Sequence, residues 1–227
     1  MKTHTITLLE KRQLTHNVIE LHFSKPDGFE FEAGQFVQFF ILRDGGFIKR
    51  SYSLCSINTD DALHFCIKIE EGGSASEYFS NMSAGNAAKI SEPLGRFTCS
   101  EEESNLVFIG AGVGITPIFG MIRNIIENEK TKNNLKLFFG VRNSREIFWK
   151  KELDQLRCAY ENFEYAFCLS GDNSDPECHS GRVTDHLEDA MTESQYYICG
   201  SPQMVQDTRK LLLAKGVPKE NLYFEMF

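Results

Sequence analysis

The chain has 227 residues, an apolar content of 41% and a net charge of −8, so it is long enough for one large domain or two modest ones, each with its own core. The net acidity argues against nucleic acid and anionic membranes as partners, because both are bound through a basic face. No segment is apolar enough to span a bilayer or to act as an export signal, which indicates a cytoplasmic protein.

The seven cysteines are dispersed along the chain and include no C-x-x-C pair. An iron–sulfur cluster or a structural zinc ion requires clustered thiolates, so we expect no metal site. In a cytoplasmic protein such cysteines are typically reduced. Any redox chemistry must therefore come from a bound organic cofactor.

Up to about Ser100 the chain alternates short β segments with turn residues. We expect strands at 3–9, 18–23, 35–42, 49–56 and 63–70, turns at 26–28 and 44–46, and one helix at 74–82. Short strands at such regular intervals predict a small antiparallel barrel.

From Asn105 apolar strands alternate with helices. The expected strands are 106–109, 135–139, 163–169, 196–199 and 222–225, and the expected helices are 116–127, 147–158 and 202–215. This alternation predicts a parallel sheet covered on both faces. The acidic run at 101–103 marks the boundary, which gives domains 1–101 and 102–227.

A glycine-rich segment, GAGVGITP at 110–117, follows an expected strand and opens a helix. Its glycines let the backbone approach a pyrophosphate, and a helix N-terminus offers free N–H groups and a favourable dipole. Ile115 stands at the third glycine position of the usual dinucleotide fingerprint, and Arg142 replaces the acidic ribose ligand after the next strand. Alone, the segment also fits a turn in any α/β sheet.

The heptad RSYSLCS at 50–56 combines residue types suited to a long phosphate-bearing ligand. Arg50 offers a bidentate cation for phosphate, Tyr52 a flat face for stacking, and the serines hydroxyl groups. Strand alternation places Arg50 and Tyr52 on one side and Ser51 and Ser53 on the other. Without further motifs this is an ordinary polar strand.

The heptad resembles the flavin motif of the ferredoxin–NADP reductase family. Other segments resemble further motifs of that family in the same order: GGSAS at 72–76, PLGRF at 93–97, GAGVGITP at 110–117, CGSPQM at 199–204 and the terminal EMF at 225–227. The resemblance implies an oxidoreductase with an FAD-binding barrel followed by an NADPH- or NADH-binding α/β domain.

The resemblance also implies roles for individual residues. Tyr52 would stack on the isoalloxazine and Ser53 would hydrogen-bond near flavin N5, while Thr116 would border the nicotinamide. The residues implied to bind FAD are Arg50, Ser51, Tyr52, Ser53, Gly72, Gly73, Ser74 and Ser76. Those implied to bind the nicotinamide dinucleotide are Gly110, Gly112, Thr116, Arg142, Ser170, Cys199, Gly200 and Phe227.

Ser53, Cys199, Glu225 and Phe227 are the candidate catalytic residues. Glu225 would tune or relay protons to the reduced flavin. Phe227 would cover the flavin until nicotinamide displaces it, so we hypothesise that Phe227 gates nicotinamide access.

Preference between NADPH and NADH rests on few residues. Arg142, with Arg145 nearby, suits a 2′-phosphate, which needs a cation. NADPH-preferring relatives tend to show Ser-Arg after the following strand, where this chain has Ser170-Gly171-Asp172. Arg142 favours NADPH slightly.

Ferredoxin or flavodoxin is the electron partner that the resemblance implies. A flavin reductase that releases reduced flavin and the reductase component of an oxygenase are alternatives, and a non-catalytic electron-bridging subunit is a third. Neither the electron acceptor nor the oligomeric state is encoded in a recognisable motif.

Overall fold

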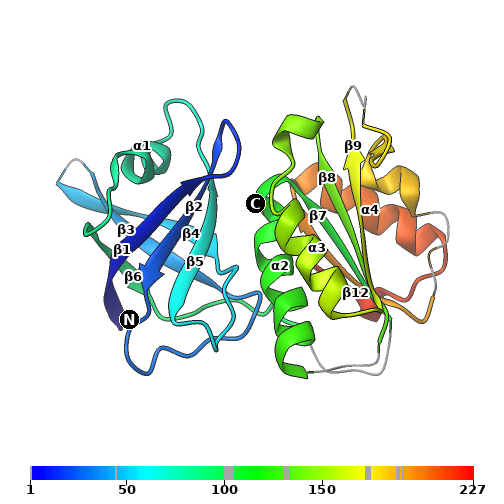
Figure 1. The fold of residues 1–227 in the computed structure, drawn as a ribbon, viewed down its shortest axis with the longest axis horizontal. Coiled ribbons are helices and arrows are strands. Elements are labelled where there is room, and N and C mark those ends of the chain that lie inside the picture. Colours follow the sequence, from blue (N-terminus) through cyan, green and yellow to red (C-terminus); the bar gives the residue numbers. More distant parts are fainter. Residues whose placement is uncertain are drawn as a thin grey trace. The chain divides into compact units, whose positions relative to one another are not determined.

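The computed structural model describes residues 2–43, 45–99, 105–129, 133–171, 175–187, 190 and 192–227. The chain forms two compact units, Met1–Cys99 and Ser100–Phe227 (Figure 1). Three features of the sequence interpretation, namely Asp44 of the expected turn, the acidic run at 101–103 and Asp172, lie outside the described residues.

The first unit is a curled antiparallel sheet of six strands in the order β4-β3-β6-β1-β2-β5. Its elements are β1 (Thr3–Gln13), β2 (Val18–Ser24), β3 (Phe36–Arg43), β4 (Gly46–Ser53), β5 (Ala62–Lys68), α1 (Ser74–Asn81) and β6 (Ala87–Ser91). The two edge strands approach each other where Leu54, just after β4, bridges to Phe65 of β5. The predicted antiparallel barrel is confirmed, as a sheet that curls far enough to nearly close.

Aromatic side chains fill the interior of this curled sheet. The ring of Phe39 lies edge-on to Phe65 at 5.0 Å and to Phe79 at 5.1 Å. Phe79 belongs to α1, so the short helix is anchored to the barrel by a buried ring. Burial of such a side chain contributes about 1.5–3 kcal/mol to the free energy of folding. This packing fixes α1, and with it the glycine turn that precedes the helix.

Two strand features of the first unit were not expected from the sequence. β6 is an additional strand in which only Ala88 and Ile90 point inward, too weak an alternation to stand out. β1 continues to Gln13 through a polar segment because Arg12 and Gln13 pair with Glu20 and Ile19 of β2. Hydrogen bonding to a neighbouring strand, not side-chain pattern, makes both segments β.

The second unit is a parallel sheet in the order β10-β9-β8-β7-β11-β12. Its strands are β7 (Leu106–Ala111), β8 (Leu135–Val141), β9 (Phe163–Leu169), β10 (His179–Ser180), β11 (Gln195–Gly200) and β12 (Leu222–Met226). Its helices are α2 (Ile115–Asn124), α3 (Lys150–Ala159) and α4 (Pro202–Ala214). α2 and α3 lie on one face of the sheet and α4 on the other, as predicted (Figure 1).

The start of α3 differs from the expectation of a helix from residue 147. Phe148 and Trp149 are buried, with Phe148 edge-on to Phe139 at 5.1 Å and Trp149 stacked on Phe119 at 4.3 Å. To place both rings in the core, Trp149 adopts a left-handed backbone with φ of 59°, and the helix begins one residue later. Tertiary packing here overrides helical periodicity.

α4 begins and ends as its sequence indicates. The Ser201 side chain accepts a hydrogen bond from the Met204 N–H at 3.3 Å, and Pro202 occupies the first turn. Gly216, with φ of 86°, ends the helix. No helix within the described ranges is long and apolar enough to cross a membrane.

Candidate functional site

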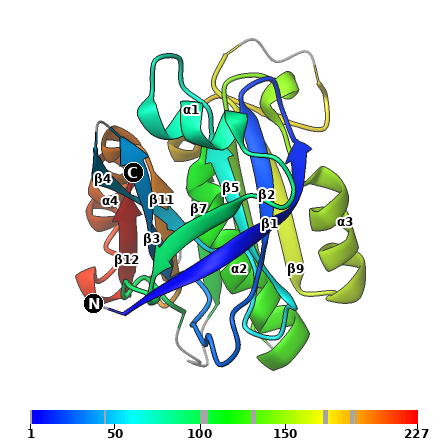
Figure 2. The same cartoon turned by 90° about the vertical axis from the view of Figure 1, so that its left-hand side faces the viewer.

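The carboxyl ends of the parallel strands bring three of the predicted site residues into one row. From β7 the chain proceeds outward to β8 and β9, and then returns to place β11 and β12 on the other side of β7. Figure 2 shows β11 and β12 on one side of β7 and β9 on the other. Open α/β sheets bind ligands where the strand order reverses in this way. Cys199 of β11 pairs with Gly110 of β7 and with Glu225 of β12, so all three lie at this position.

The glycine-rich loop is held against β11 by close backbone contact. A Cβ atom on Gly114 would lie 2.7 Å from both the carbonyl carbon of Cys199 and the Cα of Gly200. Gly112 has φ of 54°, a left-handed conformation that favours glycine. The glycines therefore serve to bring the loop and the Cys199-Gly200 turn together, which sequence spacing alone does not reveal.

The loop leads into the N-terminus of α2. The Ile115 N–H donates to the Gly112 carbonyl of the loop, the cap residue Gly114 has no side-chain partner, and no acidic residue occupies the first turn of α2. The arrangement suits an anion such as a pyrophosphate. The Thr116 hydroxyl is buried and donates to the Val113 carbonyl at 2.6 Å, so it stabilises the loop from inside.

Cys199 is fully buried at the end of β11. Burial, together with the nearby carboxylate of Glu225, raises the pKa of its thiol well above the ordinary value of 9.0. The group is therefore a neutral thiol at physiological pH and not a thiolate nucleophile. Any role in catalysis comes from its shape and position.

The end of the chain lies along the same row. The Phe227 N–H donates to the Gly200 carbonyl at 3.1 Å, which fixes the terminal residue beside the turn. The Phe227 side chain remains 49% exposed. The second unit thus places Gly200, Glu225 and Phe227 close together.

The ends of β8 and β9 hold a second part of the candidate site. Gly171 N–H donates to the Arg142 carbonyl at 2.8 Å, and Ser170 N–H donates to the Val141 carbonyl at 3.1 Å. A Cβ on Gly171 would lie 2.7 Å from the Arg142 carbonyl oxygen, so this close approach requires glycine. Arg142 is exposed beside Ser170.

Sequence reasoning missed Arg182, a further cation at this edge. The short strand β10 pairs with the end of β9, and the Gly181 N–H donates to the Leu169 carbonyl at 2.8 Å. Arg182 follows directly, so it flanks the end of β9 as Arg142 does. A strand of two residues has no periodicity that would identify it from sequence.

In the first unit, β4 presents Arg50 and Tyr52 on the same face. They pair with Phe39 and Val37, whose side chains point into the barrel. The Tyr52 ring packs edge-on against Phe39 and Phe79 and remains partly exposed. Burial, opposed by Arg50, raises the pKa of Tyr52 to about 12 from 10.0, so the phenol stays protonated.

Ser53 and Ser51 lie on the opposite face of β4 from Tyr52. Ser53 is buried, whereas Ser51 is exposed. Arg50 is exposed, and its guanidinium donates to the Lys49 carbonyl at 2.9 Å. An exposed guanidinium beside a half-buried aromatic ring is an arrangement that fits a phosphate joined to a flat ring system.

The glycine turn at 72–76 opens α1. Gly72 has φ of 71°, and the Ser76 hydroxyl accepts a hydrogen bond from the Glu70 N–H at 2.9 Å. A Cβ on Gly73 would lie 2.9 Å from that hydroxyl oxygen. The turn therefore leaves the amides at Ser74 and beyond at the open end of α1, a second cradle that suits phosphate.

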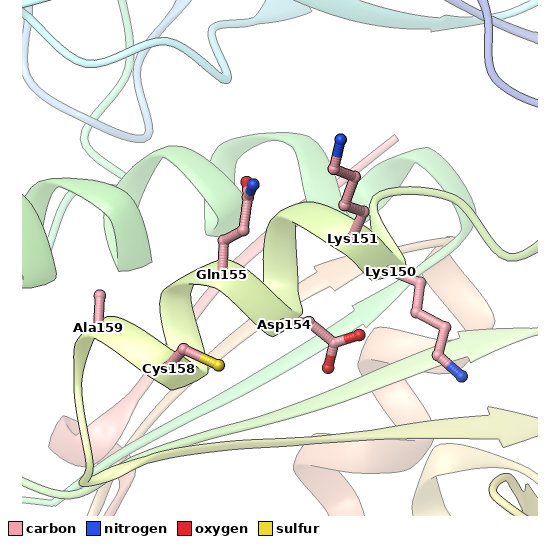
Figure 3. A pocket seen from close by; sticks show the side chains of 6 residues that line it. All are labelled: Lys150, Lys151, Asp154, Gln155, Cys158 and Ala159. Atoms are coloured by element: carbon pink, nitrogen blue, oxygen red, sulfur yellow. The ribbon is translucent and has the colours of Figure 1, made fainter.

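Other features of the surface do not join these residues. A groove along α3 is lined by Lys150, Lys151, Asp154, Gln155, Cys158 and Ala159, and Figure 3 shows Lys151 and Gln155 pointing away from Asp154 and Lys150. None of the predicted site residues lines it. Among the described residues, no three His, Cys, Asp or Glu side chains are placed to hold a metal ion.

Comparison with protein families assigns each unit separately. A family model described as an oxidoreductase FAD-binding domain matches residues 5–99, and one described as an oxidoreductase NAD-binding domain matches residues 108–210. The first match contains the heptad at 50–56 and the turn at 72–76, and the second contains the loop at 110–117 and the turn at 199–200.

Curated relatives include reductases of two kinds. The chain is 28% identical over 227 residues to the reductase component of propane 2-monooxygenase from Rhodococcus jostii, covering 94% of this chain and 60% of the relative. It is 29% identical over 235 residues to ferredoxin–NADP reductase B from Sorangium cellulosum, covering 97% of this chain and 96% of the relative. The chain thus spans about three fifths of the propane monooxygenase reductase that it matches.

Solved structures share the fold at lower identity. A cytochrome P450 reductase from Amycolatopsis has a TM-score of 0.91 at 24% identity, covering all of this chain and 70% of that one. A ferredoxin NADP+ reductase from Neisseria gonorrhoeae with bound FAD and NADP has a TM-score of 0.86 at 24% identity, covering 100% of this chain and 98% of that one. These similarities establish the arrangement of elements.

Proposed function

The chain belongs to the ferredoxin–NADP reductase family, with an FAD-binding and an NAD-binding domain, and we propose that it passes electrons from NADPH or NADH through FAD to a small redox protein such as ferredoxin or flavodoxin. The observation that supports this proposal is that a glycine turn opens a helix in each unit, Gly72-Gly73 before α1 and the loop at 110–114 before α2. We infer that each turn holds one dinucleotide.

Bound FAD would supply the chemistry, by accepting a hydride and releasing electrons singly or in pairs. The protein's task is to hold and orient the cofactor. Arg50 and the amides that follow Gly72-Gly73 would bind the pyrophosphate, and Tyr52 would stack on the isoalloxazine. Because the Tyr52 phenol is protonated, it adds no negative charge beside the flavin.

The nicotinamide dinucleotide would lie across the switch point of the second unit. The loop at 110–114 and the start of α2 would bind its pyrophosphate, and the Cys199-Gly200 turn would border the nicotinamide. The buried, neutral Cys199 thiol would keep water from the end of β11 and would not compete as a nucleophile. Glu225, paired in register with Cys199, would hold or move a proton there.

The relatives support two kinds of electron acceptor. The relative that matches along 96% of its own length is named a ferredoxin–NADP reductase, which supports ferredoxin or flavodoxin. A second candidate function is the reductase component of an oxygenase, favoured by relatives such as the propane 2-monooxygenase and toluate 1,2-dioxygenase reductases. The two functions are distinguished by comparing the rate at which the enzyme reduces ferredoxin or flavodoxin with the rate at which it reduces an oxygenase component.

The first experiment tests FAD binding. Purified protein should be yellow, retain FAD through gel filtration, and reduce ferricyanide with NADPH or NADH. Arg50→Ala should weaken FAD binding roughly ten- to a hundredfold, since a hydrogen bond to a charged group contributes about 1.5–3 kcal/mol. Titration of the FAD-free protein with FAD measures this change.

Arg43→Ala is the matched control, because Arg43 lies on the adjoining strand β3 and has no assigned role with FAD. It should retain FAD as the parent protein does. A colourless protein that binds no FAD would contradict the proposal, and equal FAD affinity in both variants would remove Arg50 from the site.

A further inference from the structure

The hairpin formed by β3 and β4 exposes two large apolar side chains. Leu42 is 66% exposed and Phe47 is 62% exposed, and the two residues pair directly across the hairpin. Figure 1 shows this hairpin extending past the neighbouring strands of its sheet. Single exposed apolar residues are common, but a cross-strand pair at a projecting hairpin is a candidate contact surface.

Two lysines lie beside Phe40, the next outward residue of β3 before Leu42. The ammonium groups of Lys49 and Lys89 lie 5.2 Å and 5.9 Å from the ring centre of Phe40, so one aromatic ring is flanked by two cations. Between Gln38 and Arg50 the sequence has two basic residues, Arg43 and Lys49, and one acidic residue, Asp44, which lies outside the described residues. In a chain with a net charge of −8, Lys49 and Lys89 give this outward face a local positive charge.

The register shows that this surface is separate from the FAD-binding face. Phe40 pairs with Lys49 and Leu42 with Phe47, while the alternating inward positions on β3 are buried in the barrel. Arg50 and Tyr52 therefore lie on the opposite face of β4 from Phe47 and Lys49. We call the outward residues Phe40, Leu42, Phe47, Lys49 and Lys89 the hairpin patch.

β4 is nevertheless an edge strand, so the two faces share one open border. Phe47 and Tyr52 are five residues apart, about 17 Å along a strand. A small globular protein about 30 Å across that rests on the patch would also extend over the border toward the residues assigned to the flavin. Docking on the patch is therefore compatible with electron transfer.

We propose that the hairpin patch is the docking surface for an acidic electron-carrier protein, an inference that rests on the proposed function. An apolar centre with a charged rim is typical of protein interfaces, and the aromatic ring of Phe47 is the natural anchor. Lysines at the rim attract an acidic partner and accelerate its association. They oppose pairing of two copies of the patch, since like charges would face each other.

The test uses the FAD-loaded enzyme with a plant-type [2Fe–2S] ferredoxin and a flavodoxin as acidic probes, and ferricyanide as a small acceptor. The variants are Phe47→Ser and the double variant Lys49→Glu/Lys89→Glu. Each should raise the KM for the protein carrier roughly tenfold or more at low ionic strength and leave ferricyanide reduction unchanged. High salt should raise the parent KM and reduce its difference from the double variant.

The matched control is Lys210→Glu/Lys219→Glu, which makes the same change in net charge at exposed positions of the second unit. It should leave the KM for the carrier near the parent value. If the hairpin variants also behave like the parent protein, docking on the hairpin patch is ruled out while the proposed function stands. If the parent enzyme does not reduce ferricyanide, the proposed function itself fails.

Vesicles of phosphatidylcholine with phosphatidylserine provide the remaining arm, because apolar and basic residues on a hairpin also suit a lipid surface. We expect no binding of the enzyme to these vesicles. Binding that Phe47→Ser abolishes, with no effect of that variant on carrier reduction, would overturn the proposal in favour of a membrane surface.

Discussion

At the scale of single residues, burial determines the charge state of the candidate groups. Tyr52 and Cys199 both have a raised pKa because their surroundings disfavour the ionised form. Both side chains are therefore neutral over the physiological range. The charged groups of the candidate sites are instead exposed arginines such as Arg50 and Arg142, which need no desolvation before they meet a phosphate.

Tyr52 should make the folded protein sensitive to alkaline pH. Its folded pKa of about 12 exceeds the ordinary value of 10.0, so the folded state holds the phenolic proton more tightly than the unfolded state. The resulting stability is fully present below pH 10 and is lost as pH rises toward 12. In Tyr52→Phe, the free energy of unfolding should fall less between pH 10 and 12.

Urea denaturation of FAD-free parent and variant at several pH values measures this difference. Other groups with a raised pKa, such as Cys168, are present in both proteins and cancel in the comparison. Parallel pH dependences for parent and variant would show that Tyr52 titrates normally in the folded chain.

Arg142 and Arg182 should set the preference between NADPH and NADH. Each follows a strand end at the same edge of the sheet, and a 2′-phosphate needs cationic partners. Arg142→Ala and Arg182→Ala should each lower kcat/KM for NADPH about tenfold or more, with little change for NADH. Steady-state kinetics with both cofactors measure the ratio.

Arg157→Ala serves as the control for this pair. Arg157 is an exposed arginine of α3 that pairs with Asp154 at 2.8 Å and has no assigned role with the dinucleotide. Equal losses with NADH and NADPH in the Arg142 and Arg182 variants would instead indicate a general effect on binding of the dinucleotide.

At the scale of elements, the glycine loop and β11 depend on each other. Gly114 is required by the backbone of Cys199 and Gly200, and a Cβ on Gly200 would lie 2.5 Å from the Met204 side chain and 3.3 Å from Ala111. The loop, the start of α2 and the end of β11 therefore form one packed structure. Its stability and its capacity to bind a dinucleotide should change together.

Gly114→Ala tests this coupling. The added methyl group must displace backbone atoms, which should destabilise the second unit by about 1–3 kcal/mol and weaken nicotinamide binding. Thermal unfolding and titration with NADP+ measure the two effects. Gly46→Ala is the control, since its Cβ would meet no atom closer than 3.9 Å, and it should change stability by no more than about 1 kcal/mol.

At the scale of the whole molecule, the chain assigns one dinucleotide to each compact unit. The FAD-binding motifs all lie before residue 100 and the nicotinamide motifs all lie after it. In the proposed reaction one hydride passes between the two dinucleotides. Phe227 is the residue proposed to regulate nicotinamide access, because its N–H bonds to the Gly200 carbonyl.

Phe227→Ala should alter nicotinamide affinity and the ratio of NADH to NADPH activity. The variant keeps the backbone N–H that bonds to Gly200 and removes only the ring, so any effect belongs to the side chain. Met226→Ala is the neighbouring control, with a side chain of similar exposure. Unchanged kinetics in Phe227→Ala would exclude a gate at the terminus.

The sequence by itself determined the class of each half and the position of most elements. Short β segments separated by turn residues identified the strands of the barrel, and the change to apolar strands separated by helices identified the parallel sheet. The ends of α4 were encoded by Ser201, Pro202 and Gly216, because capping is a local property. The motifs at 50–56 and 110–117 were recognisable from sequence because their arginine, tyrosine, serine and glycine residues have chemical properties suited to phosphate-bearing ligands.

Only the tertiary structure decided which of these residues lie close together in space. The start of α3 moved to Lys150 because the rings of Phe148 and Trp149 had to enter the core, a contact that periodicity does not encode. The position of Arg182 depended on a two-residue strand formed by pairing with β9. Strand pairing and packing bring together residues that are distant in sequence. The fold alone therefore shows that Gly110, Cys199 and Glu225 lie in one row and that the hairpin patch faces outward.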